Sequence, residues 1–219
     1  MRLRRTALVV IVALVGITAV VGMAMATGGL GRVSAPTPVT VGPVMHDAGS
    51  GPLSTHLEGR SDQVLALDPV NAGKTFSVAT PLCVLTGGPV TLTGAGPLDT
   101  LGTSSDWTFL GAKLQVTPPG GAEAFLGTDG FPPTTPDGEL SDVEGSVVSS
   151  PCAEDSAGRT DALLGFSSSK DSHGGGWTST RIDYRQGGKQ YALVVHDTWV
   201  LCGTAAASVS ECASYASAP

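Results

Sequence analysis

The sequence is poor in charge, in aromatic residues and above all in basic residues. Only 14% of its 219 residues are charged and 5% are aromatic, and 12 lysines and arginines stand against 19 acidic residues. Nucleic-acid binding needs clustered basic side chains that neutralise phosphates, so this class of partner is excluded. The 30 glycines and 15 prolines, with no sustained helical period after residue 30, exclude a helical bundle or a coiled coil.

Complete catalytic and metal-binding motifs are also lacking. The sequence contains no G-x-S-x-G, H-E-x-x-H, C-x2-C or EF-hand pattern. His196 lies on an expected strand, and it acts as a catalytic base only if a distant serine and an acid converge on it. We therefore expect no catalytic residue, no metal and no cofactor. A secreted hydrolase with an unrecognised site stays open as an alternative.

A long apolar run stands near the N-terminus. Residues 7–26 contain no charge, and Thr18 is their only polar side chain. At about 1.5 Å per residue, a helix of this length spans roughly 30 Å, the thickness of the hydrocarbon core of a membrane. Three arginines precede the run, so the positive-inside rule keeps the N-terminus in the cytoplasm and places the rest of the chain outside.

We predict that residues 1–30 form the signal-anchor transmembrane helix of a single-pass cell-membrane protein. The alternative is a signal peptide, because Ala24-Met25-Ala26 matches the A-x-A pattern and allows cleavage after Ala26 and secretion. The run is longer than the apolar region of an ordinary signal peptide, which favours the anchor. Both interpretations place the remainder of the chain outside the cytoplasm.

The exported part is acidic. Residues 1–26 contain three of the basic residues and no acidic residue, which leaves a net charge of −10 for the remainder. Residues 31–60 are rich in glycine, proline, serine and threonine and predict a tether. Residues 61–204 then predict a disulfide-bonded domain, and residues 205–219 a C-terminal tail. The expected partners are the membrane, reached through the N-terminal helix, and a ligand of the cell envelope.

Short apolar runs broken by glycine and proline follow the tether. The clearest pair is Trp177–Arg185 and Gln190–Leu201, in which alternate residues share a face on either side of Gly187-Gly188. This pattern predicts a β-hairpin, and Pro118–Pro136 predicts a long loop. Several short strands with frequent turns and no helix predict an all-β fold. We expect an antiparallel β-sandwich, which an immunoglobulin-like arrangement fits.

The four cysteines, Cys83, Cys152, Cys202 and Cys212, lie on the exported side, where disulfides persist. Their even number and the lack of a metal-ligand spacing predict two structural disulfides. Four cysteines allow three connectivities. Because Cys83 precedes an expected strand and Cys202 ends one, we favour Cys83–Cys202 with Cys152–Cys212. The pairing of Cys83 with Cys152 and of Cys202 with Cys212 stays open.

Two features are weak candidates for binding. An acidic loop holds five carboxylates between Asp129 and Glu144. Hard oxygen ligands suit an extracellular Ca²⁺ site, although a solvated loop is the default interpretation. Trp199 and the other two tryptophans offer a platform for a glycan, although a sandwich core uses tryptophan as readily. The candidate binding residues are therefore Asp137, Glu139, Asp142, Glu144 and Trp199.

Three short motifs carry a resemblance: Pro81-Leu82-Cys83-Val84, Arg181–Gly188 and Val200-Leu201-Cys202. With the arginine-rich start, the apolar segment and the tether, the chain resembles small exported envelope proteins of high-GC actinobacteria. The resemblance implies an envelope location and carries over no catalytic residue. If those proteins share the pairing, it adds to the preference for Cys83–Cys202. We expect an envelope-anchored, non-catalytic binding or structural module, with a Ca²⁺- or glycan-binding module and a hydrolase as alternatives.

Overall fold

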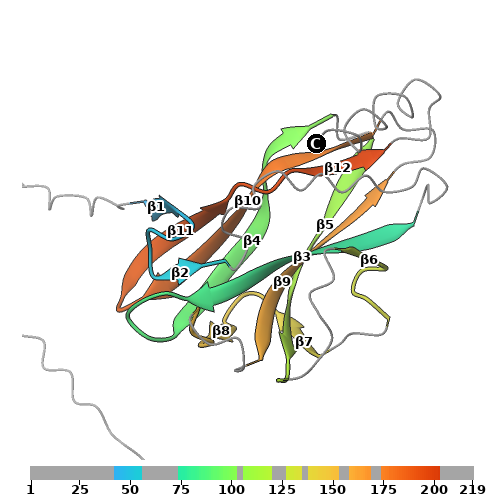
Figure 1. Cartoon of the computed structure of the whole chain (residues 1–219). Helices are drawn as coiled ribbons and strands as arrows, with labels where there is room; N and C mark the ends of the chain where they lie inside the picture. The colour runs from blue at the N-terminus through green and yellow to red at the C-terminus, as the bar shows by residue number, and fades with distance from the viewer. Residues whose placement is uncertain are drawn as a thin grey trace, which may run out of the picture. The chain divides into compact units, whose positions relative to one another are not determined.

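The strands that the structure describes belong to two sheets (Figure 1). A computed structural model describes residues 42–55, 74–102, 106–119, 127–134, 138–152, 158–168 and 174–202. The chain divides into the units Met1–Thr40 and Val41–Pro219, and every described residue belongs to the second. The described residues contain strands and connecting segments but no helix, which confirms the all-β prediction.

The described residues of this unit form twelve strands. They are β1 (Val44–Asp47), β2 (Leu53–Ser54), β3 (Thr75–Val84), β4 (Val90–Leu101), β5 (Trp107–Thr117), β6 (Gly127–Asp129), β7 (Glu139–Asp142), β8 (Val147–Val148), β9 (Arg159–Ser168), β10 (Gly174–Gln186), β11 (Lys189–Val195) and β12 (Trp199–Cys202).

The first sheet has the order β1-β11-β10-β4-β8, and β12 also pairs with β10. The second has the order β2-β3-β9-β5-β7, and β6 also pairs with β3. Only the pairing of β1 with β11 is parallel among the strands described. Both sheets are curled, an arrangement compatible with a β-sandwich (Figure 1).

Aromatic side chains from both sheets meet in one core. Trp177 on β10 is fully buried, and its ring lies 5.6 Å from Phe166 on β9 and 5.6 Å from Trp107 on β5. Trp199 on β12 lies 6.5 Å from Trp177. The apolar faces of the two sheets are therefore buried against each other, which is the main source of stability in such a fold.

The predicted hairpin is confirmed. Strands β10 and β11 pair from Thr180 opposite Val195 to Gln186 opposite Lys189, with a two-residue turn between them. The turn residues Gly187 and Gly188 have φ angles of 56° and 78°, which glycine adopts without the cost that a Cβ brings.

Some of the strands lie where the sequence predicts none. Strand β6 lies within the loop predicted over Pro118–Pro136, and β1 and β2 lie within residues 31–60, where we expect a tether. These strands are only two to four residues long and add to existing edges. Backbone pairing of this kind needs no apolar alternation, so composition does not reveal it.

The predicted transmembrane helix lies outside the described residues, which contain no helix able to cross a membrane.

The favoured disulfide is wrong. Cys83 bonds to Cys152, with an S–S distance of 2.09 Å and a Cα–Cα distance of 4.8 Å. The preference for Cys83–Cys202, including the support it drew from the resemblance, is therefore corrected in favour of the alternative partner.

The reason lies in a contact between segments that are distant in the sequence. Val84, at the end of β3, donates its N–H to the Ser150 carbonyl at 2.8 Å and accepts the N–H of Cys152 at 3.0 Å. These bonds bring the two cysteine backbones together. Cys202 instead ends β12 in the other sheet, and Cys212, its remaining partner, lies outside the described residues.

Candidate functional site

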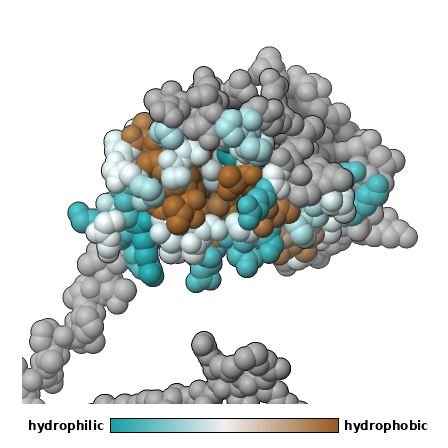
Figure 2. All heavy atoms as spheres, turned by 90° about the horizontal axis from the view of Figure 1, so that it is seen from below, coloured by the Kyte–Doolittle hydropathy of each residue, from teal (hydrophilic) through white to brown (hydrophobic). Residues whose placement is uncertain are grey.

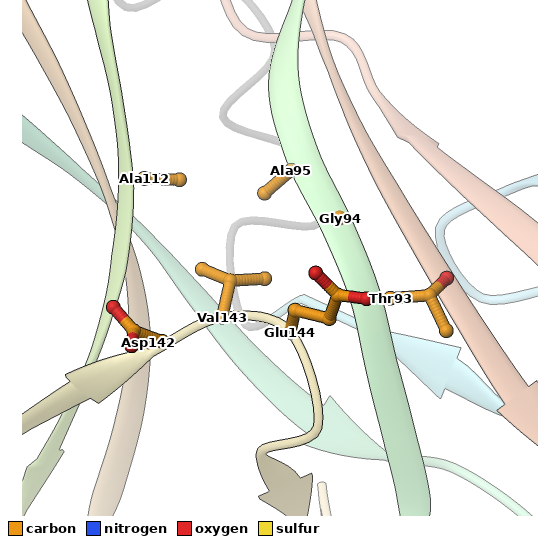
Figure 3. A pocket seen from close by; sticks show the side chains of 7 residues that line it. All are labelled: Thr93, Gly94, Ala95, Ala112, Asp142, Val143 and Glu144. Atoms are coloured by element: carbon orange, nitrogen blue, oxygen red, sulfur yellow. The ribbon is translucent and has the colours of Figure 1, made fainter.

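A hollow of about 470 Å³ lies between β4 and β5 (Figure 3). Ala95 on β4 and Ala112 on β5 face each other across it, and Val143 from the β7–β8 connection points between them. The complete lining is Thr93, Gly94, Ala95, Ala112, Asp142, Val143 and Glu144. We call this feature the edge hollow, because it lies beside strands that lack a partner on one side.

The edge hollow lies where two short strands stop covering the longer ones. Strand β8 pairs only with Val90 and Thr91 of β4, and β7 pairs only with Lys113–Val116 of β5. Leu92 still exchanges two backbone hydrogen bonds with the β7–β8 connection. Beyond Leu92, the described residues pair with β4 only on its β10 side. Before Lys113, they pair with β5 only on its β9 side.

The two carboxylates at the edge hollow have different environments. Lys113 Nζ lies 2.6 Å from Asp142 Oδ1. The hydrogen bond from Lys113, followed by its charge, lowers the pKa of the Asp142 carboxyl. Glu144 is exposed and takes part in no ion pair among the described residues, and its side chain extends toward Thr93 (Figure 3). The rim is therefore acidic, with one neutralised and one free carboxylate.

The molecular surface on the side of β7 and β8 is mixed. Figure 2 looks at the domain from this side and shows apolar residues in brown next to hydrophilic residues in teal. Val147 on β8 and Val116 on β5 are 53% and 44% exposed. A mixed surface of this kind suits a contact that combines apolar burial with polar recognition.

Only part of the predicted binding set comes together. Asp142 and Glu144 line the edge hollow, whereas Glu139 lies at the opposite end of β7, paired with Val116. Asp137 lies outside the described residues. Within the described ranges no three acidic, histidine or cysteine side chains are placed to hold a metal ion.

Trp199 lies in the core. It is 3% exposed and packs near Trp177, so its ring does not form a platform at the surface. Trp199 therefore belongs to the core, as expected for tryptophan in a sandwich, and not to a glycan-binding platform.

A second polar group lies on the first sheet. The Ser179 hydroxyl lies 3.2 Å from His196 Nδ1, and His196 Nε2 lies 3.2 Å from Asp47 Oδ1. Ser179 comes from β10, His196 follows β11, and Asp47 ends β1. The sequence pattern draws attention to His196 but to neither of its partners. The hairpin register carries a signal for Ser179, because it places this residue beside His196.

The order serine–histidine–aspartate matches the chemistry of a hydrolytic triad, but the serine is poorly placed to attack a substrate. Ser179 is only 3% exposed and lies inside the sheet between β4 and β11. A flanking strand on each side leaves little room for oxyanion donors beside it. The arrangement can fix the ring of His196 and attach Asp47 to the sheet.

A hydrogen-bonded chain also attaches β1. The Tyr184 hydroxyl lies 2.6 Å from His46 Nε2 and accepts the N–H of Leu53 at 3.3 Å. Burial raises the pKa of Tyr184 to about 12, so the phenol keeps its proton and donates it to His46. His46 Nδ1 lies 2.9 Å from the Asp47 carbonyl oxygen, which can only accept, so Nδ1 carries a hydrogen. This chain holds β1 against β10 and β2.

Comparisons with protein-family models and with curated proteins find no match.

Proposed function

We propose that the protein is an envelope-anchored, extracytoplasmic β-sandwich protein of immunoglobulin-like arrangement. Its domain acts as a non-catalytic binding or structural module. Two sheets with a shared aromatic core support the sandwich. The Cys83–Cys152 disulfide supports an oxidising location, and the arginine-flanked run of residues 7–26 supplies the anchor.

The binding role rests on one observation, the edge hollow. It combines a concave surface, two unpaired strand edges and the free carboxylate of Glu144. Ligand sites are concave and mostly apolar, with a few polar groups that fix orientation. The edge hollow is concave and has apolar side chains in Ala95, Ala112 and Val143, but its rim is more polar than that of such a site, because Thr93, Asp142 and Glu144 also line it.

The location is tested with the full-length chain carrying a C-terminal epitope tag. Cells are fractionated, and intact cells are treated with a protease added from outside. We expect the tag in the membrane fraction and its loss on protease treatment. Tagged protein in the medium that starts after Ala26 supports the secreted alternative. A tag that is protected in intact cells and cleaved only after lysis overturns the proposal.

A hydrolase is the second candidate, and the Ser179–His196–Asp47 series is the observation that favours it. A fluorophosphonate probe labels a nucleophilic serine that a histidine activates. We expect no labelling, because Ser179 is buried. Labelling that disappears in both Ser179→Ala and His196→Ala would replace the binding role with a catalytic one.

A Ca²⁺-binding module remains the alternative for the acidic loop. Lys113 already neutralises Asp142, which leaves Glu144 as the free carboxylate of the edge hollow. We expect millimolar Ca²⁺ to leave the melting temperature unchanged. A rise that EDTA reverses would support the Ca²⁺ site instead.

A further inference from the structure

We propose that the β4 edge beside the edge hollow binds an extended, basic peptide segment of another protein by strand addition. The inference rests on the proposed binding function and names the partner chemistry for the edge hollow. It follows from three features: an unpaired strand edge, a concave space beside it and an excess of negative charge.

The unpaired edge supplies the backbone contacts. From Gly94 to Gly96, β4 pairs with β10 on one side and with no other strand in the described chain, and Thr93 lies at the register shift of this pairing. Exposed N–H and C=O groups along such an edge are a template for an additional strand. Pro97 follows and lacks an N–H, so it interrupts the pattern of backbone donors. The segment open to pairing is therefore short and lies against the edge hollow.

The edge hollow accepts side chains of the added strand. Its walls beside β4 and β5 are formed by Gly94, Ala95 and Ala112, which leave the backbone uncovered. Val143, which is 5% exposed, gives the space an apolar floor. Alternate side chains of a bound strand point to one face. A peptide with valine or threonine at alternate positions therefore fits one side chain into this space.

The charges select a basic partner. Glu144 is exposed without an ion pair among the described residues, and the exported part of the chain has a net charge of −10. An acidic segment is repelled by this field, whereas a lysine next to the pairing residues meets the Glu144 carboxylate. Because surface ion pairs contribute little, the backbone pairing supplies most of the affinity and Glu144 the selectivity.

The test uses the full-length protein in detergent and a fluorescein-labelled synthetic peptide of alternating valine and threonine with central lysines. Fluorescence anisotropy measures binding. We expect saturable binding that weakens with salt. The same peptide with alternate backbone amides N-methylated should lose binding, because it cannot donate to β4. A peptide with glutamates in place of the lysines should bind more weakly, by up to about fivefold for the loss of a single surface charge contact.

Variants of the protein make the test specific. Glu144→Lys should weaken binding of the lysine peptide by about fivefold or more. Glu139→Lys is the matched control, because it makes the same charge change on an exposed residue at the far end of β7, about 10 Å from Asp142. It should leave the affinity nearly unchanged. Unchanged circular dichroism spectra show that both variants fold.

Several outcomes overturn the inference. These are no binding of the lysine peptide, equal binding of the N-methylated peptide, or equal effects of the two charge reversals. The proposed envelope location is measured separately by protease treatment of intact cells. An accessible domain that fails the peptide test therefore refutes the strand addition and leaves the location standing.

Discussion

The indole N–H of Trp199 donates a hydrogen bond to Asp197 Oδ2 over 2.9 Å. The hydroxyl of Thr80 donates to the same oxygen over 3.2 Å. Thr80 belongs to β3 in the second sheet and Trp199 to β12 in the first, so one buried carboxyl group joins the two sheets. Burial raises the pKa of Asp197 to about 6, although hydrogen bonds from Trp199, Thr180 and Thr80 oppose the shift.

Because of this carboxyl group, we predict that the domain is more stable in mild acid than at neutral pH. Asp197 is 4% exposed, and its pKa of about 6 lies above the ordinary value of 3.8. The folded state therefore binds the proton more tightly than the unfolded state. The stabilisation from protonated Asp197 is fully present below pH 3.8 and is lost as the pH rises through about 6. The loss amounts to about 3 kcal/mol, at 1.36 kcal/mol per pKa unit.

Urea unfolding between pH 4 and pH 7 measures this effect, with Asp197→Asn as the comparison. The asparagine keeps a polar side chain of the same shape but does not titrate in this range. We expect the difference in unfolding free energy between the two proteins to change with pH in the direction given above. A difference that stays constant across this interval would show that Asp197 titrates normally.

We predict that removing the Cys83–Cys152 disulfide greatly destabilises the domain. It joins residues 69 positions apart. Closing a loop of this length restricts the unfolded chain and stabilises the fold by about 4 kcal/mol in the chain-entropy account. We expect the double variant Cys83→Ser/Cys152→Ser to unfold at much lower urea concentration. Peptide mapping without reduction should recover the peptides of Cys83 and Cys152 linked together, and a Cys83–Cys202 link would contradict the structure.

Local features of the fold could be predicted from the sequence, and non-local ones could not. The hairpin around Gly187 and Gly188 depends on neighbouring residues, so alternation and the glycine pair reveal it. The partner of Cys83 depends on the contact of Val84 with Ser150, which belong to different parts of the chain. No pattern near either cysteine carries that information.

The candidate site shows the same division. The acidic loop identifies Asp142 and Glu144 as a group, but the edge hollow exists only because β7 and β8 stop where they do. The contact of His196 with Ser179 follows from the hairpin register, whereas its contact with Asp47 needs the parallel pairing of β1. A strand of four residues in the expected tether gives no periodic signal for that pairing.

Gly51 is predicted to be essential for the position of β1. A Cβ at this position would collide with the imidazole of His46, which is bound to Tyr184. We expect Gly51→Ala to displace the ring, break the hydrogen bond to the part-buried Tyr184 hydroxyl and destabilise the domain by about 1–3 kcal/mol. Gly42→Ala is the matched control, because a Cβ there meets no atom within 4 Å. Equal urea midpoints for the two variants would show that the His46 contact contributes nothing.

We predict that breaking the ion pair between Lys113 and Asp142 strengthens binding of the lysine peptide. The pair is exposed, with side-chain exposures of 34% and 80%, so its loss changes stability little. Lys113→Gln removes the charge and the ammonium hydrogen bond that hold the pKa of Asp142 down, leaving at most a weaker bond from a neutral amide, and an NMR titration should show that pKa rising toward its ordinary value. At neutral pH the carboxylate remains ionised and is no longer neutralised by Lys113. The edge hollow then presents two free carboxylates, and the lysine peptide should bind about two- to threefold more tightly at low salt. Lys189→Gln, at the exposed start of β11 next to the hairpin turn, makes the same change in net charge away from the edge hollow. If both lysine variants raise the affinity equally, the net charge of the domain, and not Asp142, controls the binding of basic peptides.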